Sequence, residues 1–212
     1  MIHLKINYPN GQPAFQRPTS RHSQAPISLN NKGTFANRGM SFEEEINKSN
    51  HYYLTKGRAV IHKKPTPIQI VDVHYPKRSA AVIKEAYFKE ASTTDYNGIY
   101  NGFYIDFEAK ATKNKTSFPL ANFHQHQIDH MEHCLKQGGI IFVLIWFSTL
   151  KECYLFPAKP LIHYWKQKET NRKSIPINCI RQDGFDIPLG FAPSIPYLDA
   201  LDQYILEGDH LK

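Results

Sequence analysis

The stretch TTDYNGIYNGFYIDFEAKAT, residues 93–112, decides how the rest of the chain is interpreted. Two runs rich in aromatic and β-branched residues flank Asn101-Gly102, a dipeptide that strongly favours a β-hairpin. The second run places Asp106, Glu108 and Lys110 at alternate positions, which puts them on one face of a strand. The opposite face is expected to join the core through Ile105, Phe107 and Ala109.

Two acids and a lysine in this pattern suit the hydrolysis of a phosphodiester. Asp95 lies on the first run of the hairpin, so it is expected near Glu108 and Lys110. Carboxylate oxygens bind hard cations such as Mg²⁺, and a nearby ammonium can orient water or stabilise charge that develops on phosphorus. The pattern therefore indicates a nuclease site. A half-exposed strand with a solvated polar face is the simpler alternative.

The bulk composition is that of a globular protein with a basic surface. The 212 residues are 41% hydrophobic and 21% charged, and the formal net charge is +7. Such a surplus of positive charge favours a polyanionic partner, either nucleic acid or an anionic membrane. The alternative is a protein that is basic without having such a partner. Three scattered cysteines form no CxxC motif and fit a reducing cytoplasm. The chain lacks a signal peptide pattern, and its longest apolar run, 140–147, is too short to cross a bilayer.

The chain divides into a polar arm and one domain. Residues 1–38 contain no acidic residue and few periodic apolar positions, which predicts a disordered basic arm. Such an arm either follows a phosphate backbone or is a terminus without a role. Residues 39–212 are expected to form the folded domain. It begins with a helix to about residue 54, because Ser41 and Glu44 form a capping box.

The elements that follow predict a mixed sheet. Short strands are expected at 59–62 and 68–73, separated by a turn or projecting loop because Pro65 and Pro67 exclude regular ladder pairing. Residues 77–88 are predicted to be helical and basic. A helix from about 123 ends at Gly138, and the apolar run 140–147 is typical of a strand buried on both faces. A strand at 152–156, a helix at 161–167, an irregular tail and a last helix at 197–207 complete an α/β or α+β domain whose mixed sheet is flanked by helices.

Several motifs, in order, resemble the RecU family of bacterial Holliday junction resolvases within the PD-(D/E)xK nucleases. The resemblance is close from about Arg38 to Glu152, and looser over the whole chain. It rests on RGMSFEEEINKSNHYY, VIHKKPTPIQIV, IKEAYF, STTDYNGIYNGFYIDFEAKAT, SFPLANFHQHQIDHM and GGIIFVLIWF. The resemblance implies a restriction-endonuclease-like core with a projecting stalk at about 62–88. It also implies a homodimer that uses Mg²⁺, for which Mn²⁺ can substitute.

Residue by residue, the resemblance assigns the site. Asp95, Glu108 and Lys110 match the catalytic acids and lysine of the family, and Thr93 and Gln127 match positions that complete the metal site. For Gln127, an amide bonded to the backbone is the alternative. Thr94 stands where the general nuclease motif has proline. Asp106 matches no catalytic position and is interpreted as a residue that supports the site or the fold.

Basic and aromatic residues alternate in the predicted stalk. Cations bind phosphates and rings can cover unstacked bases, so these residues are expected to contact DNA. The alternative for the two aromatic residues is packing in the core. The predicted DNA-binding residues are Lys63, Lys64, Lys77, Arg78, Lys84, Tyr87 and Phe88.

Four histidines lie close together in the helix from about residue 123. The spacing of His126 and His130 is that of a zinc pair, but no HExxH motif or cysteine cluster accompanies it. A solvated or DNA-facing helix surface is therefore favoured. It would carry His124, His126, His130 and His133.

The combined prediction is a cytoplasmic enzyme of recombination and repair that resolves four-way DNA junctions by paired Mg²⁺-dependent nicks. A four-way junction has twofold symmetry, and a C₂ homodimer supplies two sites related in the same way. Two alternatives remain open. One is a restriction-type endonuclease that acts on duplex DNA, and the other is a DNA protein that binds junctions without cutting them.

Overall fold

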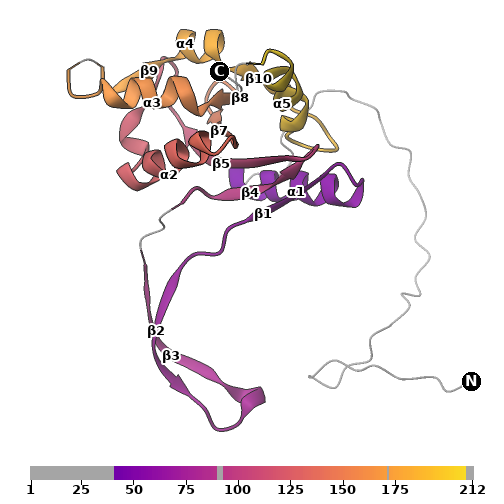
Figure 1. Ribbon diagram of the computed structural model, residues 1–212, viewed down its shortest axis with the longest axis vertical. Coiled ribbons are helices and arrows are strands. Elements are labelled where there is room, and N and C mark those ends of the chain that lie inside the picture. The colour runs from indigo at the N-terminus through magenta and orange to yellow at the C-terminus, as the bar shows by residue number, and fades with distance from the viewer. Residues whose placement is uncertain (1–40, 90–92, 171, 209–212) are drawn as a thin grey trace, which may run out of the picture. The chain divides into compact units, whose positions relative to one another are not determined.

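The computed structural model describes residues 41–89, 93–170 and 172–208 (Figure 1). The arm predicted for residues 1–38 lies outside this part of the chain, and the domain boundary at residue 39 stays a prediction. Within the described ranges, no helix is long and apolar enough to cross a membrane.

A six-stranded mixed sheet forms the centre of the fold. Its strand order is β1-β4-β5-β7-β8-β10, and β5 pairs with β7 in parallel while the other pairs are antiparallel. The mixed sheet expected from the sequence is thereby confirmed. Its strands are β1 (Ala59–Lys63), β4 (Tyr96–Tyr100), β5 (Phe103–Thr112), β7 (Ile140–Phe147), β8 (Glu152–Pro157) and β10 (Phe185–Asp186).

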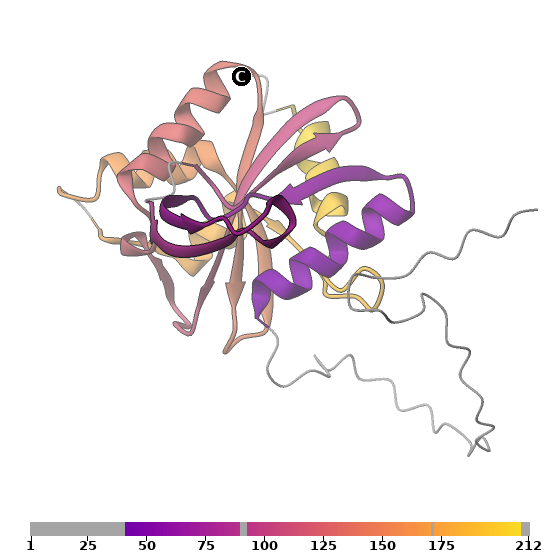
Figure 2. The ribbon, with the colours of Figure 1, turned by 90° about the horizontal axis from the view of Figure 1, so that it is seen from below.

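Helices cover both faces of this sheet. One core contains buried residues of α1 (Phe42–Thr55) and α5 (Tyr197–Leu206). The other contains residues of α2 (Gln125–Lys136), α3 (Ala158–Lys166) and α4 (Ile177–Asp183), and Figure 2 shows α1 and α2 on opposite sides. Side chains of β7 enter the two cores alternately, as a strand buried on both faces requires. Burial of each such aliphatic or Phe side chain stabilises the folded state by about 1.5–3 kcal/mol relative to leaving it exposed to water.

Local signals place two elements that matter for the site. The Ser41 main-chain N–H donates to Glu44 Oε2 at 2.7 Å, and the Glu44 N–H donates to Ser41 Oγ at 3.3 Å, so the capping box starts α1 as predicted. Asn101 and Gly102 have φ angles of 48° and 83°, which is the left-handed conformation that a tight turn between β4 and β5 needs. The predicted hairpin is confirmed.

The helix predicted for residues 77–88 is wrong. This segment holds a 3₁₀ turn, η1 (Arg78–Ala80), and the strand β3 (Val82–Phe88), which pairs antiparallel with β2 (Ile68–His74). All seven residues of β3 are exposed, so neither helical nor strand periodicity marks a buried face. Pairing with β2 decides the conformation. The hairpin β2–β3 is a two-stranded sheet of its own, drawn apart from the central sheet in Figure 1.

The tail predicted to be irregular contains short elements. Besides α4 and β10, it has β9 (Ser174–Pro176), which pairs with β6 (Ser117–Pro119) just before η2 (Leu120–Asn122). Strands of two or three residues are too short to show a periodic pattern, and only long-range pairing defines them. The last helix, α5, begins at Tyr197 as expected.

Candidate active site

The antiparallel pairing of β4 with β5 brings the two candidate acids together. Tyr96 pairs with Phe107, so Asp95, just before β4, lies beside Glu108 near the middle of β5. The Asn101-Gly102 turn therefore converts a separation of 13 residues into direct contact.

Asp95 and Glu108 each bind the backbone on the other's side of the hairpin. The Asp95 main-chain N–H donates to Glu108 Oε2 at 3.1 Å. In return, the Ala109 N–H donates to Asp95 Oδ2 at 3.2 Å. These reciprocal hydrogen bonds hold two carboxylates side by side, although like charges repel. Such an arrangement needs a cation or a proton between the acids.

Two further predicted residues converge on one oxygen of Glu108. Lys110 Nζ lies 2.6 Å from Glu108 Oε1. Gln127 of α2 donates from Nε2 to the same oxygen at 2.6 Å. The structure thus brings together Asp95, Glu108, Lys110 and Gln127, which the resemblance assigns to the site, and their roles stay predictions.

The amide of Gln127 is turned with its NH₂ group toward the acids. Its Oε1 accepts the His124 main-chain N–H at 3.1 Å, so the alternative of a backbone-bonded amide also holds. A Gln127 oxygen would reach a cation beside Glu108 only after the amide rotates. Thr93 precedes the acids, and its hydroxyl donates to the Thr94 carbonyl at 3.3 Å. Its predicted role as a ligand stays a prediction.

Burial perturbs Glu108 strongly. Its side chain is 1% exposed because α2 covers this face of β5, so the alternative of a solvated polar face is wrong. The pKa of Glu108 is raised to about 7, chiefly because burial disfavours its charged form; the Lys110 ammonium lowers the pKa and the Asp95 carboxylate raises it. A buried acid with a raised pKa beside a second acid is typical of a functional site.

The donor set fits a hard divalent cation. Carboxylate oxygens of Asp95 and Glu108 adjoin each other, and the carbonyl oxygen of Gln127 can join them by rotation of its amide. All of these are oxygen ligands, which Mg²⁺ and Mn²⁺ accept and which zinc uses less readily than histidine or cysteine. A cation here would also offset the repulsion between two adjacent carboxylates, one of which is buried.

A second polar cluster lies beside the acids and was not predicted as a unit. It surrounds the buried carboxylate of Asp106, which contacts side chains from four segments of the chain. One signal in the sequence points to it, since His130 follows Gln127 by three residues and shares its helix face. The contacting residues are Lys64, Thr94, Tyr104 and His130.

The helix histidines do not form one uniform surface. His130 is partly buried with Nε2 3.2 Å from Asp106 Oδ2, so a solvated or DNA-facing position is wrong for this residue. His124 and His133 are exposed, and the rings of His124 and His126 stack with centroids 5.4 Å apart.

The predicted DNA-binding residues lie in different environments. Tyr87 is 60% exposed and Phe88 is 84% exposed, so the alternative that they pack in the core is wrong. Lys77 and Lys84 are also exposed, and the side chain of Arg78 lies outside the described residues. Lys63 forms an ion pair with Glu43. Lys64 differs from the others, since its side chain is only 18% exposed and its ammonium binds Asp106.

Sequence comparisons match this chain to one family over most of its length. The family model described as Recombination protein U matches residues 37–203. The Holliday junction resolvase RecU of Latilactobacillus sakei is 57% identical over 203 residues, which is 95% of this chain and 97% of that protein. The protein of the same name from Streptococcus equi is 57% identical over 205 residues, covering 97% of this chain and 99% of its own. Among solved structures, Hjc, a Holliday junction resolvase of Archaeoglobus fulgidus, matches at 11% identity with a TM-score of 0.38, covering 66% of this chain and 94% of its own.

Proposed function

Because the chain belongs to the RecU family of recombination proteins, we propose that it is an endodeoxyribonuclease that resolves four-way DNA junctions in recombination and repair. The observation that carries this proposal is the pairing of Asp95 with Glu108, with Lys110 Nζ 2.6 Å from the Glu108 carboxylate. We place the enzyme in the cytoplasm, where its free cysteines stay reduced and its DNA substrate lies.

The residues of the proposed site have two roles: some bind the cation, and Lys110 stabilises charge on the phosphate. Asp95 and Glu108 hold Mg²⁺, for which Mn²⁺ can substitute, with Gln127 and Thr93 as further oxygen donors. The bound cation supplies charge neutralisation at the scissile phosphate and acidifies the attacking water. The Lys110 ammonium lies beside Glu108 and stabilises the negative charge that develops on phosphorus. Glu108 must release its proton before it can bind the cation.

The hairpin β2–β3 supplies selectivity for the junction. Tyr87 and Phe88 expose their rings, and Lys77 and Lys84 expose their ammonium groups on the same hairpin. Cations bind the phosphates of any DNA, but aromatic rings need accessible base faces. The open centre of a four-way junction presents such faces, whereas a closed duplex does not.

A second copy of the chain completes the enzyme. A two-stranded hairpin is marginally stable in water by itself, and this one exposes many apolar side chains. Packing against the hairpin of a second copy would cover them and give two active sites related by a twofold axis, as paired nicks on a junction require. The exposed apolar residues are Ile68, Ile70, Val71, Val82 and Ile83.

The test is cleavage of a synthetic mobile four-way junction and of a matched linear duplex, each with and without Mg²⁺. Paired nicks in the junction alone, only with Mg²⁺, support the proposal. Equal cleavage of the duplex indicates a restriction-type enzyme. Junction binding without cleavage in Mg²⁺ indicates a non-catalytic binding protein.

A further inference from the structure

Asp106 is a fully buried carboxylate bound by several donors. Its side chain is 0% exposed. One oxygen, Oδ2, lies 2.7 Å from Lys64 Nζ, 2.7 Å from Tyr104 Oη and 3.2 Å from His130 Nε2. The other, Oδ1, accepts a hydrogen bond from the Thr94 hydroxyl. We call these five residues the Asp106 cluster.

The cluster is an ion pair with supporting hydrogen bonds, and its positive charge comes from Lys64. Asp106, His130 and Cys134 do place three potential metal-ligand atoms within 4.8 Å of one another. However, the Lys64 ammonium already lies 2.7 Å from the Asp106 oxygen that also faces His130, and it would repel a divalent cation there. A buried carboxylate is costly unless it is paired and hydrogen-bonded, and the cluster meets both conditions.

Three members of the cluster lie close in the chain to residues of the proposed metal site. Thr94 directly precedes Asp95, and Asp106 lies on the same face of β5 as Glu108. His130 lies three residues after Gln127 on α2. The cluster therefore fixes the loop, the strand and the helix that carry the acids and the amide.

Lys64 makes the most direct connection to Asp95. Its main-chain N–H donates to the Asp95 carbonyl at 2.7 Å. Its ammonium donates to the Thr94 hydroxyl at 2.9 Å as well as to Asp106. Three bonds thus tie one lysine to the segment that presents Asp95 and to the strand that presents Glu108.

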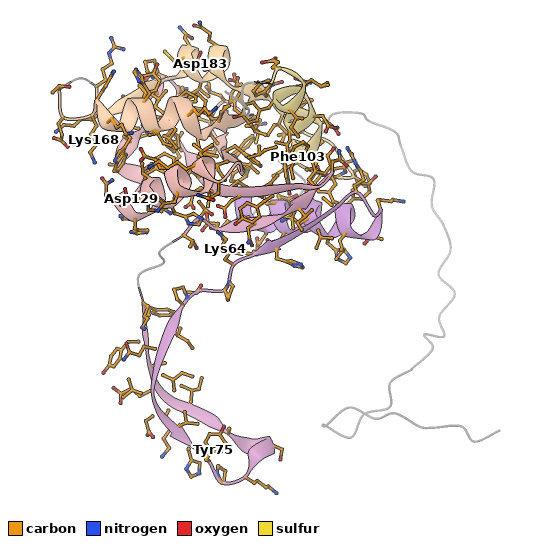
Figure 3. The ribbon with its side chains drawn as sticks, viewed as in Figure 1. Lys64, Tyr75, Phe103, Asp129, Lys168 and Asp183 are labelled. Carbon is orange, nitrogen blue, oxygen red and sulfur yellow. The ribbon has the colours of Figure 1, made fainter. Side chains whose placement is uncertain are left out.

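The same cluster ties both connections of the hairpin β2–β3. Lys64 directly follows β1 and leads toward β2, and Thr94 lies on the return from β3 to β4. Figure 3 labels Lys64 where the chain passes from the central sheet toward the hairpin. The hydrogen bonds of the cluster therefore connect both ends of the hairpin to the segment that carries Asp95.

We propose that Lys64 and Asp106 are positioning residues, which hold Asp95 beside Glu108 in the geometry that binds the cation and keep the root of the hairpin in register with the cleavage site. This inference rests on the proposed nuclease function. It also gives Lys64 a role different from the other basic residues of the hairpin, since its ammonium binds protein rather than phosphate.

The test compares Lys64→Met, Asp106→Asn and the double variant with the conservative Lys64→Arg. Lys166→Met is the matched control, because Lys166 of α3 is an exposed lysine that pairs with Glu132 of α2 at 2.6 Å, outside the Asp106 cluster. Three quantities are measured: the rise in Tm on adding Mg²⁺, the single-turnover cleavage rate at saturating junction as a function of Mg²⁺ concentration, and the Kd for junction without metal. Mg²⁺ is the probe because it disfavours imidazole and thiolate ligands, so the loss of Lys64 cannot create a new site at His130 and Cys134.

For both single variants, we expect the Mg²⁺ concentration for half-maximal cleavage to rise about 10–100-fold, the usual effect of removing a residue that orients metal ligands. The Mg²⁺-induced rise in Tm should shrink at fixed Mg²⁺, while the junction Kd changes less than about twofold. Lys64→Arg should recover part of the metal response, and Lys166→Met should match wild type.

The double variant separates positioning from simple stability. It removes both charges, so it leaves no unpaired buried charge and should regain much of the Tm lost by a single variant. If Lys64 and Asp106 act by positioning Asp95 beside Glu108, the response of the double variant to Mg²⁺ stays impaired. If the double variant recovers the Mg²⁺ response, or if Lys64→Met changes only the junction Kd, the inference is wrong. If wild type neither gains Tm with Mg²⁺ nor cleaves junctions, the proposed function itself has failed.

Discussion

The Asp95 main-chain N–H donates to Glu108 Oε2 at 3.1 Å, and the Ala109 N–H donates back to Asp95 Oδ2 at 3.2 Å. The hairpin therefore fixes both acids through its own backbone, before any cation binds. Adjacent carboxylates held in this way store electrostatic repulsion that a divalent cation can relieve. The consequences can be tested in the metal-free protein, in the cleavage reaction and on the hairpin.

The first prediction concerns the stability of the metal-free protein. The pKa of Glu108 is raised from 4.5 to about 7, so the folded state binds this proton more tightly than the unfolded state does. The stabilisation that the proton provides is complete below pH 4.5 and is lost as the pH rises through about 7. Glu108→Gln stays neutral and should be more stable than wild type by about 1–3 kcal/mol at pH 8 without metal.

Thermal or urea unfolding of both proteins between pH 4.5 and 8 measures this difference. It should be near zero at the acidic end and grow with pH. Adding Mg²⁺ at pH 8 should stabilise wild type and leave Glu108→Gln almost unchanged. A difference that stays constant with pH would show that burial does not perturb Glu108 in this way.

The second prediction concerns Lys110. Its ammonium lies beside Glu108 but is not a metal ligand, so Lys110→Ala should slow single-turnover cleavage about a hundredfold while the Mg²⁺-induced rise in Tm persists. An equal loss of rate and of metal response would mean that Lys110 only holds the site together.

The third prediction concerns the aromatic residues of the hairpin. Tyr87 and Phe88 are exposed, so the double substitution Tyr87→Ser/Phe88→Ser should leave the fold intact. Affinity for a four-way junction should fall at least tenfold, since stacking on one base contributes about 1–3 kcal/mol. Affinity for linear duplex should change little in a competition gel shift at fixed salt.

A protein that lacks residues 1–33 is compared with the Tyr87→Ser/Phe88→Ser variant in the same binding experiment. Phosphate contacts carry no information about DNA shape, so the truncation should weaken junction and duplex binding by similar factors. If the aromatic variant also weakens both equally, selectivity does not depend on these rings. The spacing of the two sites in the dimer would then be the better explanation.

The fourth prediction concerns the proposed dimer. Ile70→Asp places a charge among the exposed apolar side chains of the hairpin and should convert the dimer to a monomer, as measured by light scattering. Gln69→Asp adds the same charge on the opposite face of β2 and should leave the dimer intact. A dimer that survives Ile70→Asp, or a wild-type monomer at every concentration, contradicts the proposed assembly.

Sequence reasoning predicted the parts of the fold that depend on local chemistry. Asn101 and Gly102 marked the hairpin because the left-handed turn is a local requirement, and Ser41 marked the start of α1. The hairpin also predicted that Asp95 lies near Glu108, and the register of its two strands then sets them side by side. The alternation along β5 correctly predicted the core face, but not that α2 buries the polar face as well.

The remaining features depend on contacts between distant residues. The conformation of β3 comes from pairing with β2, and no buried face of its own could reveal it. Lys64 looks like its neighbour Lys63 in sequence, yet it binds Asp106, which lies 42 residues away. Only the folded chain shows that one lysine of the pair serves the protein interior.

The most direct test of the proposed function is single-turnover cleavage of a mobile four-way junction by wild type, Asp95→Asn and Glu108→Gln, with binding measured in parallel. Each substitution keeps the shape of the side chain and removes a charge that the cation needs. Wild type should nick opposing strands only with Mg²⁺, and both variants should bind the junction with near wild-type affinity and leave it uncut. Cleavage at the wild-type rate by either variant would contradict the assignment of the metal site to Asp95 and Glu108.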